Sequence, residues 1–175
     1  GKLPDTPTLL WGIEKALTEQ DLAGRHVLVT AGPTQEAMDP VRFLSNHSTG
    51  KMGYAIAARA AMRGADATLV SGPTALDTPH GVTRVDIVSA RDMYDAVTSR
   101  APEQDFIIKA AAVGDYRPAQ TADEKLKKGD GEMNIELTRN PDILAALGKE
   151  GIKGLDGGQR ARDRRGGLSL AAHPR

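Results

Sequence analysis

Short apolar runs rich in β-branched residues recur along the chain, each bounded by turn residues. They cover residues 25–30, 66–71, 83–88 and 105–111. Runs of this length and composition are typical of strands buried in a parallel sheet. The pattern therefore predicts four strands.

Small apolar residues recur at helical spacing between these runs. They predict a helix over residues 54–63, with Ser48-Thr49-Gly50 as its cap, and another over 90–100, with Ser89 as its cap. Strands separated by helices of this length build a parallel sheet through right-handed crossovers. We therefore predict an α/β fold, a Rossmann-like doubly wound parallel sheet. An all-helical bundle is excluded, because the apolar runs are short and β-branched.

Two long segments interrupt the alternation and are predicted to be loops. The first spans residues 31–49 and the second spans 112–133, whereas such connections usually have about two to six residues. Ligands of an open parallel sheet bind beyond the carboxyl ends of its strands, which is where both segments begin. Both are therefore candidate binding segments.

The composition of the chain narrows the possible chemistry. Its 175 residues include no Cys, which excludes disulfides, thiolate metal sites and a Cys nucleophile, and favours a cytoplasmic location. The 23 basic and 23 acidic side chains balance, so no overall field favours nucleic acid. No apolar stretch approaches the roughly 18 residues of a membrane span, and the four His lack metal-binding spacing.

Charge is unevenly distributed at the end of the chain. Residues 151–175 hold six basic and two acidic side chains, a net charge of +4, with six Gly and no sustained apolar periodicity. This composition predicts a disordered basic tail.

The run from Asn46 to Gly53 (NHSTGKMG) opens the first predicted helix. Free N–H groups and the positive end of the helix dipole favour an anion there, and Gly50 and Gly53 would let a phosphate approach the backbone. The alternative is a capped helix start whose glycines pack closely on the sheet. It is not a Walker loop, because Met52 follows Lys51, and no dinucleotide fingerprint follows the first strand.

Two later runs also carry candidate groups. Residues 124–128 (EKLKK) contain three lysines that would cover phosphates as a flap, or form an ordinary solvated surface. The run Asn140-Pro141-Asp142-Ile143 begins a helix, for which Asn140 as cap and Pro141 at the first helical position are a sufficient structural reason.

Five separated motifs can be read together. They are residues 27–57 (VLVTAGPTQEAMDPVRFLSNHSTGKMGYAIA), 68–73 (TLVSGP), 107–118 (IIKAAAVGDYRP), 124–128 (EKLKK) and 137–148 (LTRNPDILAALG). In this order they resemble phosphopantothenate-cysteine ligase, also called phosphopantothenoylcysteine synthetase, over about residues 21–148. Residues 1–17 (GKLPDTPTLLWGIEKAL) are similar to the join between the decarboxylase and ligase halves of the bifunctional bacterial protein.

The resemblance implies a domain organisation. Residues 1–20 would be the linker from a preceding decarboxylase domain, and 21–150 the nucleotide-binding ligase domain. Beyond Gly148 the family continues with a strand, a Gly-Phe-Ala-Ala-Glu-Thr-like turn, a lysine-bearing helix and an Ala-Asn-Asp-like segment, none of which this sequence matches. The C-terminal part of the family fold is therefore expected to be missing or altered, with 151–175 as an atypical tail.

The resemblance also implies an activity. It is the CTP-dependent joining of 4'-phosphopantothenate to L-cysteine through an acyl-cytidylate in coenzyme A biosynthesis, with Mg²⁺ as cofactor and a homodimer in the full-length family. Asn46 would act on the acyl-cytidylate, Lys125 on the triphosphate, and Asp115 on the cytidine. The nucleotide-binding residues implied by family match are Gly50, Lys51, Ala111, Ala112, Asp115, Lys125, Asn140, Pro141, Asp142 and Ile143.

Two other classes of function stay open. One is an NAD(P)-dependent reductase on the same kind of sheet, against which the missing glycine fingerprint and the missing ribose-binding acid count. The other is a non-catalytic fragment of the ligase that acts as a binding or dimerisation module, which the unmatched tail allows.

Overall fold

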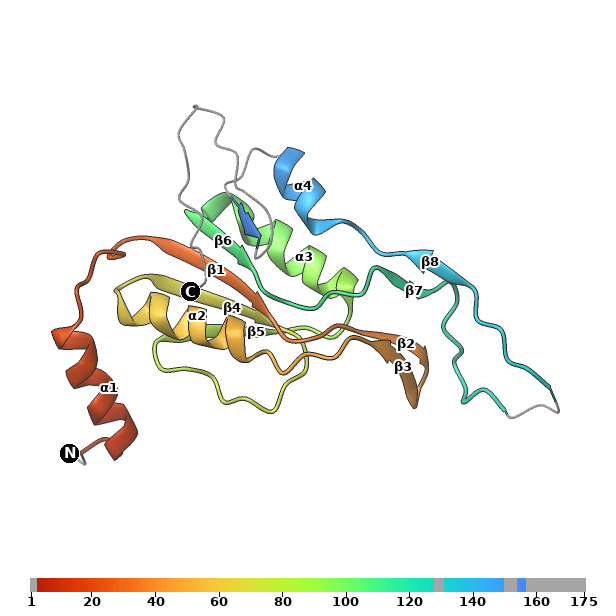
Figure 1. Ribbon diagram of the computed structural model, residues 1–175, viewed down its shortest axis with the longest axis horizontal. Coiled ribbons are helices and arrows are strands. Elements are labelled where there is room, and N and C mark those ends of the chain that lie inside the picture. Colours follow the sequence, from red (N-terminus) through yellow and green to blue (C-terminus); the bar gives the residue numbers. More distant parts are fainter. Residues whose placement is uncertain (1–2, 128–130, 150–153, 157–175) are drawn as a thin grey trace, which may run out of the picture.

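The predicted strands pair side by side in one parallel sheet (Figure 1). The computed structural model describes residues 3–127, 131–149 and 154–156. A fifth strand joins the four predicted ones, in the spatial order β5-β4-β1-β6-β9, and all neighbours are parallel. The strands are β1 (His26–Ala31), β4 (Asp66–Ser71), β5 (Val82–Asp86), β6 (Phe106–Lys109) and β9 (Gly154–Asp156).

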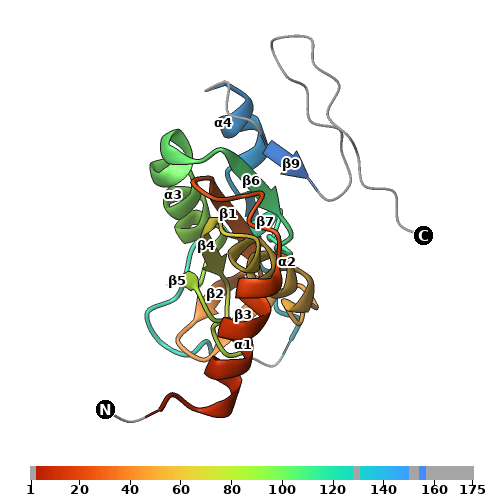
Figure 2. The ribbon, with the colours of Figure 1, turned by 90° about the vertical axis from the view of Figure 1, so that its left-hand side faces the viewer.

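Helices cover both faces of this sheet, as a doubly wound fold requires (Figure 2). Alternate residues of β1 enter two separate cores: Val27 and Val29 pack with α2 (Lys51–Met62), whereas Leu28 packs with α3 (Ala90–Arg100) and α4 (Ile143–Lys149). The first core is lined largely by alanines, so α2 lies close to the strands. The predicted fold class is confirmed.

The helix over 90–100 begins and ends where the sequence predicts, and a short 3₁₀ turn (Ala101–Glu103) follows it. Its cap is a reciprocal pair: the Ser89 hydroxyl accepts from the N–H of Asp92 at 3.1 Å, and the Asp92 carboxylate accepts from the N–H of Ser89 at 2.8 Å. The other predicted helix begins three residues early, at Lys51. Its N-cap is Gly50 with a φ of 76°, and no side chain caps it.

Both predicted loops contain strands, so those predictions were wrong in part. Residues 31–49 include the antiparallel hairpin β2 (Gln35–Asp39) and β3 (Arg42–Ser45). Its buried positions on β2 include Glu36 and Asp39, so the apolar alternation that signals a strand is missing. Within 112–133, β7 (Tyr116–Pro118) pairs with β8 (Leu137–Arg139), which lies well beyond it in sequence.

The prediction for the start of the last helix was also wrong. The helix α4 begins at Ile143, and the Asp142 carboxylate accepts from the N–H of Ala145 at 2.9 Å. Asn140 is therefore not the cap, because its amide is used on another loop, and Pro141 precedes the helix.

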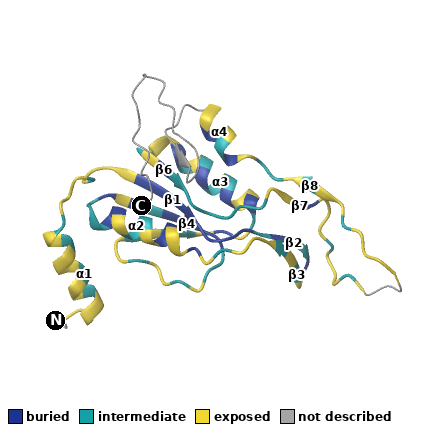
Figure 3. Ribbon diagram, in the orientation of Figure 1, coloured by how far each residue is buried: buried dark blue, intermediate teal, exposed yellow. Residues whose placement is uncertain are grey.

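The N-terminal segment, interpreted as a linker, forms the exposed helix α1 (Thr6–Leu17), capped by Asp5 (Figure 3). It meets the rest of the chain through Trp11, whose ring centroid lies 5.8 Å from that of His80. The strand β9 falls within 151–175, where the sequence predicted no element; the rest of the predicted tail lies outside the described residues. Among the helices that the structure describes, none is long and apolar enough to span a bilayer.

Candidate functional site

The loop that follows β6 is tied to the end of β1 by buried threonines. The Thr30 hydroxyl accepts from the N–H groups of Ala110 and Ala111, both at 3.2 Å. The Thr34 hydroxyl accepts from the N–H of Gly114 at 2.9 Å. Both threonines are about 1% exposed, so these bonds form in a poorly solvated environment and hold residues 110–114 in place.

The backbone of the Ala111-Ala112 pair is largely committed to this support. The Ala112 N–H donates to the Gly32 carbonyl at 2.9 Å, and the Ala112 carbonyl accepts from the Thr34 N–H at 3.2 Å. The two alanines thus lie at the carboxyl edge of the sheet, as the sequence predicts, with most of their backbone polar groups already paired.

Two side-chain amides from distant segments converge on this loop. Asn46 donates to the carbonyl of Val113 at 3.2 Å, and Asn140 donates to the carbonyl of Gly114 at 2.8 Å. The N–H of Asn140 also donates to the Asp115 carbonyl at 2.8 Å. The structure therefore brings Asn46, Asp115 and Asn140 to one loop, although 94 positions separate the two asparagines in the numbering.

A pocket of about 390 Å³ opens beside the loop, between the end of β6, the β7–β8 pair and the start of α4. Five of the predicted nucleotide-binding residues line it: Asp115, Asn140, Pro141, Asp142 and Ile143. The lining residues that sequence reasoning missed are Lys109, Val113, Gly114, Tyr116 and Arg139.

Two of the missed residues give the pocket positive charge. Lys109 ends the apolar run of β6, and the Arg139 guanidinium lies 5.9 Å from the centroid of the Tyr116 ring. The sequence contains a weak indication that Lys109 belongs to the site, because this basic residue ends a strand that is otherwise apolar. With the carboxylates of Asp115 and Asp142, the pocket presents both signs of charge to a ligand.

Glu36, one of the polar residues of the candidate binding segment 31–49, is buried. It is 4% exposed, and its carboxylate accepts from the N–H of Ala90 at 2.9 Å, at the first turn of α3. A carboxylate is stabilised at this end of a helix by the helix dipole. Glu36 thereby fixes the β2 strand against α3, beneath Gly114.

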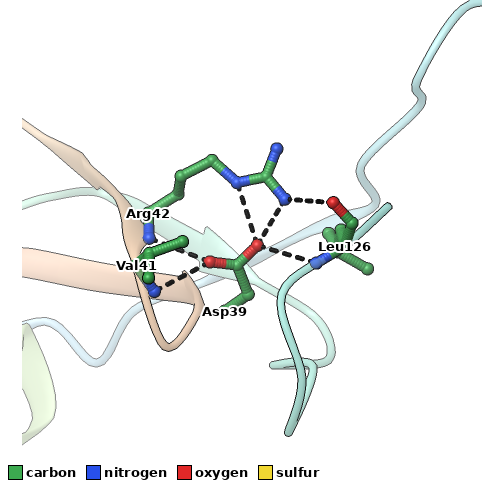
Figure 4. A network of polar contacts seen from close by, with 4 residues as sticks. All are labelled: Asp39, Val41, Arg42 and Leu126. Carbon is green, nitrogen blue, oxygen red and sulfur yellow. Dashed lines mark hydrogen bonds and ion pairs between the residues drawn. The ribbon is translucent and has the colours of Figure 1, made fainter. Parts of the chain in front are cut away.

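Lys125 lies outside the 390 Å³ pocket. It is exposed and lines a different hollow, of about 510 Å³, with Arg42, Leu126, Lys127 and Met133. The segment that carries it is attached to the β2–β3 hairpin through Asp39 and Arg42 (Figure 4).

The glycines of the run 46–53 support the close-packing interpretation. A Cβ at Gly53 would lie 2.6 Å from the Cβ of Ala31, and one at Gly50 would lie 2.8 Å from Cγ2 of Thr74. Lys51 lines a separate hollow of about 290 Å³ with Tyr54 and Asp77. The structure thus does not bring Gly50 or Lys51 into the pocket that holds Asp115.

Acidic groups for a metal ion are sparse. Across the part of the chain that the structure describes, no three His, Asp or Glu side chains cluster as a metal site. Magnesium that accompanies a nucleotide usually needs only one or two protein carboxylates beside the phosphates. Asp115 and Asp142 in the pocket fit that requirement.

The chain matches the family described as the DNA/pantothenate metabolism flavoprotein C-terminal domain over residues 22–154. It is 48% identical over 149 residues to the coenzyme A biosynthesis bifunctional protein CoaBC of Vibrio vulnificus, covering 84% of this chain and 37% of that protein. It is 53% identical over 131 residues to the Escherichia coli CoaBC protein, covering 73% of this chain and 32% of that one. The chain thus spans about a third of the length of these relatives.

Solved structures give the same result. The crystal structure of the C-terminal domain of a CoaBC protein superposes with a TM-score of 0.68 at 47% identity, covering 79% of this chain and 65% of that one. A mutant of Cab2 in complex with phosphopantothenate-cysteine shares the fold alone, with a TM-score of 0.64 at 15% identity, covering 89% of this chain and 71% of that one. The resemblance read from the five motifs is confirmed, and its span extends to β9.

Since the match includes the strands β1, β4, β5 and β6 and the whole pocket between β6, β8 and α4, the chain belongs to the DNA/pantothenate metabolism flavoprotein C-terminal domain family.

Proposed function

We propose that this chain performs the ligase reaction of coenzyme A biosynthesis, the CTP-dependent joining of 4'-phosphopantothenate to L-cysteine. The observation that carries the proposal is the pocket that gathers Asp115 and residues 140–143, with Asn46 bonded to its Val113 wall. The names of the bifunctional CoaBC relatives support the pathway.

The reaction proceeds in two halves. A carboxylate oxygen of phosphopantothenate attacks the α-phosphorus of CTP, a P–O bond breaks, and pyrophosphate leaves. The cysteine amine then attacks the acyl carbon of the acyl-cytidylate, the bond from that carbon to the bridging oxygen breaks, and CMP leaves with the oxygen. Both halves need positioned cations and hydrogen-bond donors more than a protein nucleophile.

The 390 Å³ pocket is the proposed cytidine site. The Asp115 carboxylate accepts hydrogen bonds only, so it suits the 4-amino group of cytosine and disfavours the carbonyl that uracil has there. Asn140 positions this carboxylate by fixing the Gly114 and Asp115 carbonyls. Lys109, at the end of β6, and Arg139, at the end of β8, supply positive charge toward the nucleotide.

Asn46 is the proposed catalytic amide of the second half-reaction. One of its two N–H groups is used on the Val113 carbonyl. Within the described residues the other has no acceptor, so it can donate to the acyl oxygen as charge develops on it. Lys125 is the proposed cation of the first half-reaction, directed from its exposed segment toward the triphosphate.

Magnesium would be held by the triphosphate together with Asp142, because Asp115 is used on the cytosine, and it would supply neutralisation of phosphate charge. The bifunctional relatives also support a decarboxylase domain in the same polypeptide as a partner. Homodimer formation and a cytoplasmic location stay predictions.

Isothermal calorimetry of the chain with CTP, ATP and NADPH tests the proposal. We expect CTP to bind at least tenfold more tightly than ATP, and NADPH not to bind. Asp115→Asn should weaken the binding of CTP, whereas the matched control Asp95→Asn, at an exposed position on α3, should leave it unchanged. Equal affinities for CTP and ATP would remove the cytidine assignment, and tight binding of NADPH would favour the reductase alternative.

A further inference from the structure

Asp39 is a fully enclosed carboxylate in the β2–β3 hairpin. Its side chain is 0% exposed, and both oxygens have several donors. One accepts from the N–H groups of Val41 and Arg42, both at 2.9 Å. The other accepts from the Arg42 guanidinium, which holds the pKa of the Asp39 carboxyl well below its usual range.

The same carboxylate also reaches the segment that carries the lysines. The N–H of Leu126 donates to Asp39 at 3.1 Å, and the Arg42 guanidinium donates to the Leu126 carbonyl at 2.9 Å (Figure 4). Both backbone polar groups of this one residue are therefore held by a single ion pair. We call Asp39, Arg42 and Leu126 the clasp.

Two further bonds join the same segment to β2. The Thr121 hydroxyl donates to the Ala37 carbonyl at 3.1 Å, and the N–H of Ala122 donates to the Met38 carbonyl at 3.0 Å. Residues 121–126 are thus attached to three consecutive positions of β2. The clasp is the last of these attachments before Lys127.

Enclosing the Asp39 carboxylate in the clasp costs free energy that an exposed carboxylate would not. An enclosed carboxylate is unfavourable unless its charge and lone pairs are satisfied, and Arg42 with two hairpin N–H groups already satisfies most of them. The additional bonds to Leu126 fix the backbone directly beside Lys125 and Lys127, two exposed residues that form no side-chain hydrogen bond or ion pair with the described residues. The geometry therefore constrains where these two ammonium groups can reach.

We propose that Asp39 is a positioning residue of the site, which acts by holding Lys125 through the clasp. The inference rests on the proposed function, in which Lys125 stabilises the triphosphate during pyrophosphate release. Asp39 itself does not touch the reacting atoms. It affects the reaction only by fixing the position of Lys125.

A double-mutant cycle tests the coupling. Misplacing a reacting group by about 1 Å can cost on the order of 10²-fold in rate, so Asp39→Asn should slow pyrophosphate release by about 10- to 100-fold. In a Lys125→Ala background the same substitution should slow it by no more than about twofold, because the group it positions is already gone. Effects that multiply in the double variant would overturn the proposal.

A cleavage assay tests the clasp independently of activity. Trypsin should cut the chain after Lys125 and Lys127 at least several-fold faster in Asp39→Asn than in the wild type. Asp105→Asn is the matched control, because Asp105 also accepts from an arginine and a strand N–H but lies away from this segment. It should leave cleavage at Lys125 unchanged.

A second variant covers the case in which Asp39→Asn does not fold. Arg42→Lys keeps the charge but shortens the reach to the Leu126 carbonyl, and it should also accelerate cleavage after Lys125. Unchanged cleavage in folded variants would overturn the proposal. If the wild type released no pyrophosphate while the cleavage results held, the proposed function would fail and the clasp would stand as a structural element only.

Discussion

Replacing Gly53 by alanine tests whether the glycines of the run 46–53 serve packing or phosphate. Gly53 lies in the first turn of α2, and an added Cβ would lie 2.6 Å from the Cβ of Ala31 and 2.9 Å from the carbonyl oxygen of Thr30. Both contacts are on β1, the central strand of the sheet. The helix would have to move away from the strand by about 1 Å to restore ordinary contact.

The magnitude follows from two opposing terms. Overpacking of a core typically costs about 1–3 kcal/mol, whereas exchanging glycine for alanine in a helix gains at most about 1 kcal/mol. We therefore expect Gly53→Ala to lower the free energy of unfolding by about 1–2 kcal/mol. For a chain of this size, this corresponds to a fall in Tm of roughly 2–8 °C.

Gly12→Ala is the matched control. Gly12 lies in the middle of α1, and no atom of the residues that the structure describes lies within 4 Å of an added Cβ there. The helix propensity term then acts alone, so this variant should be as stable as the wild type or up to about 1 kcal/mol more stable. Urea denaturation followed by circular dichroism measures both variants, and calorimetry with CTP follows on the same samples. If Gly53→Ala kept full stability but lost CTP binding, the packing argument would be refuted and the anion interpretation restored.

Three further predictions follow from the site and the sheet. Lys125→Ala should slow pyrophosphate release by about 10²- to 10³-fold and change stability by no more than about 0.5 kcal/mol, since the side chain is exposed. A lowered Tm with normal pyrophosphate release would show that Lys125 is an ordinary surface charge. Asn46→Asp should leave a burst of about one equivalent of pyrophosphate while acyl-cytidylate accumulates and CMP lags, measured by quenched-flow with labelled CTP; equal slowing of both half-reactions would reduce Asn46 to support for Val113. The pKa of the Asp105 carboxyl is lowered by the His26 N–H and then by Arg25, so its stabilisation is complete above the ordinary carboxyl pKa of about 3.9 and is lost as the pH falls further. The Tm difference between the wild type and Asp105→Asn should therefore be constant from pH 7 to 5 and shrink below about pH 4, and a difference that persisted to pH 2 would contradict the assigned shift.

The sheet could be predicted from the sequence because local and tertiary preferences agree there. The strand over 66–71 is buried at four of its six positions, and Ser89 begins α3 through a cap made entirely by neighbours in sequence. The start of α2 was predicted less well. The helix begins directly after Gly50, which has a positive φ, and this is earlier than the spacing of the apolar residues indicates.

The hairpin could not be predicted because its buried positions are charged. By the usual alternation, charged residues such as Glu36 and Asp39 are expected on the exposed face of a strand. Here both are buried, because each carboxylate accepts hydrogen bonds from partners that are distant in sequence or that come together only in the folded hairpin. The role of Asn140 was missed because its partner, too, is distant in sequence. As an isolated residue before a helix it reads as a cap, whereas its amide is committed to Gly114, which lies 26 positions earlier in the chain.

All the residues that line the pocket lie in two of the five motifs, 107–118 and 137–148, but sequence reasoning assigned a role to only half of them. Asp115 and residues 140–143 meet in one pocket. Lys109 and Arg139 join them because the end of β6 faces the β7–β8 pair, a pairing across about 20 residues that no periodicity signals. The roles assigned to these residues stay predictions.

The transfer of oxygen from phosphopantothenate to CMP tests the proposed reaction most directly. The chain is incubated with CTP, L-cysteine, magnesium and phosphopantothenate labelled with ¹⁸O in both carboxylate oxygens, and the nucleotide products are weighed by mass spectrometry. Attack of the carboxylate on the α-phosphorus predicts one ¹⁸O in each CMP and one in each amide carbonyl, with unlabelled pyrophosphate. CMP without label, or CDP and phosphate as the products, would contradict an acyl-cytidylate and with it the assignment of Asn46 and the cytidine pocket to ligation.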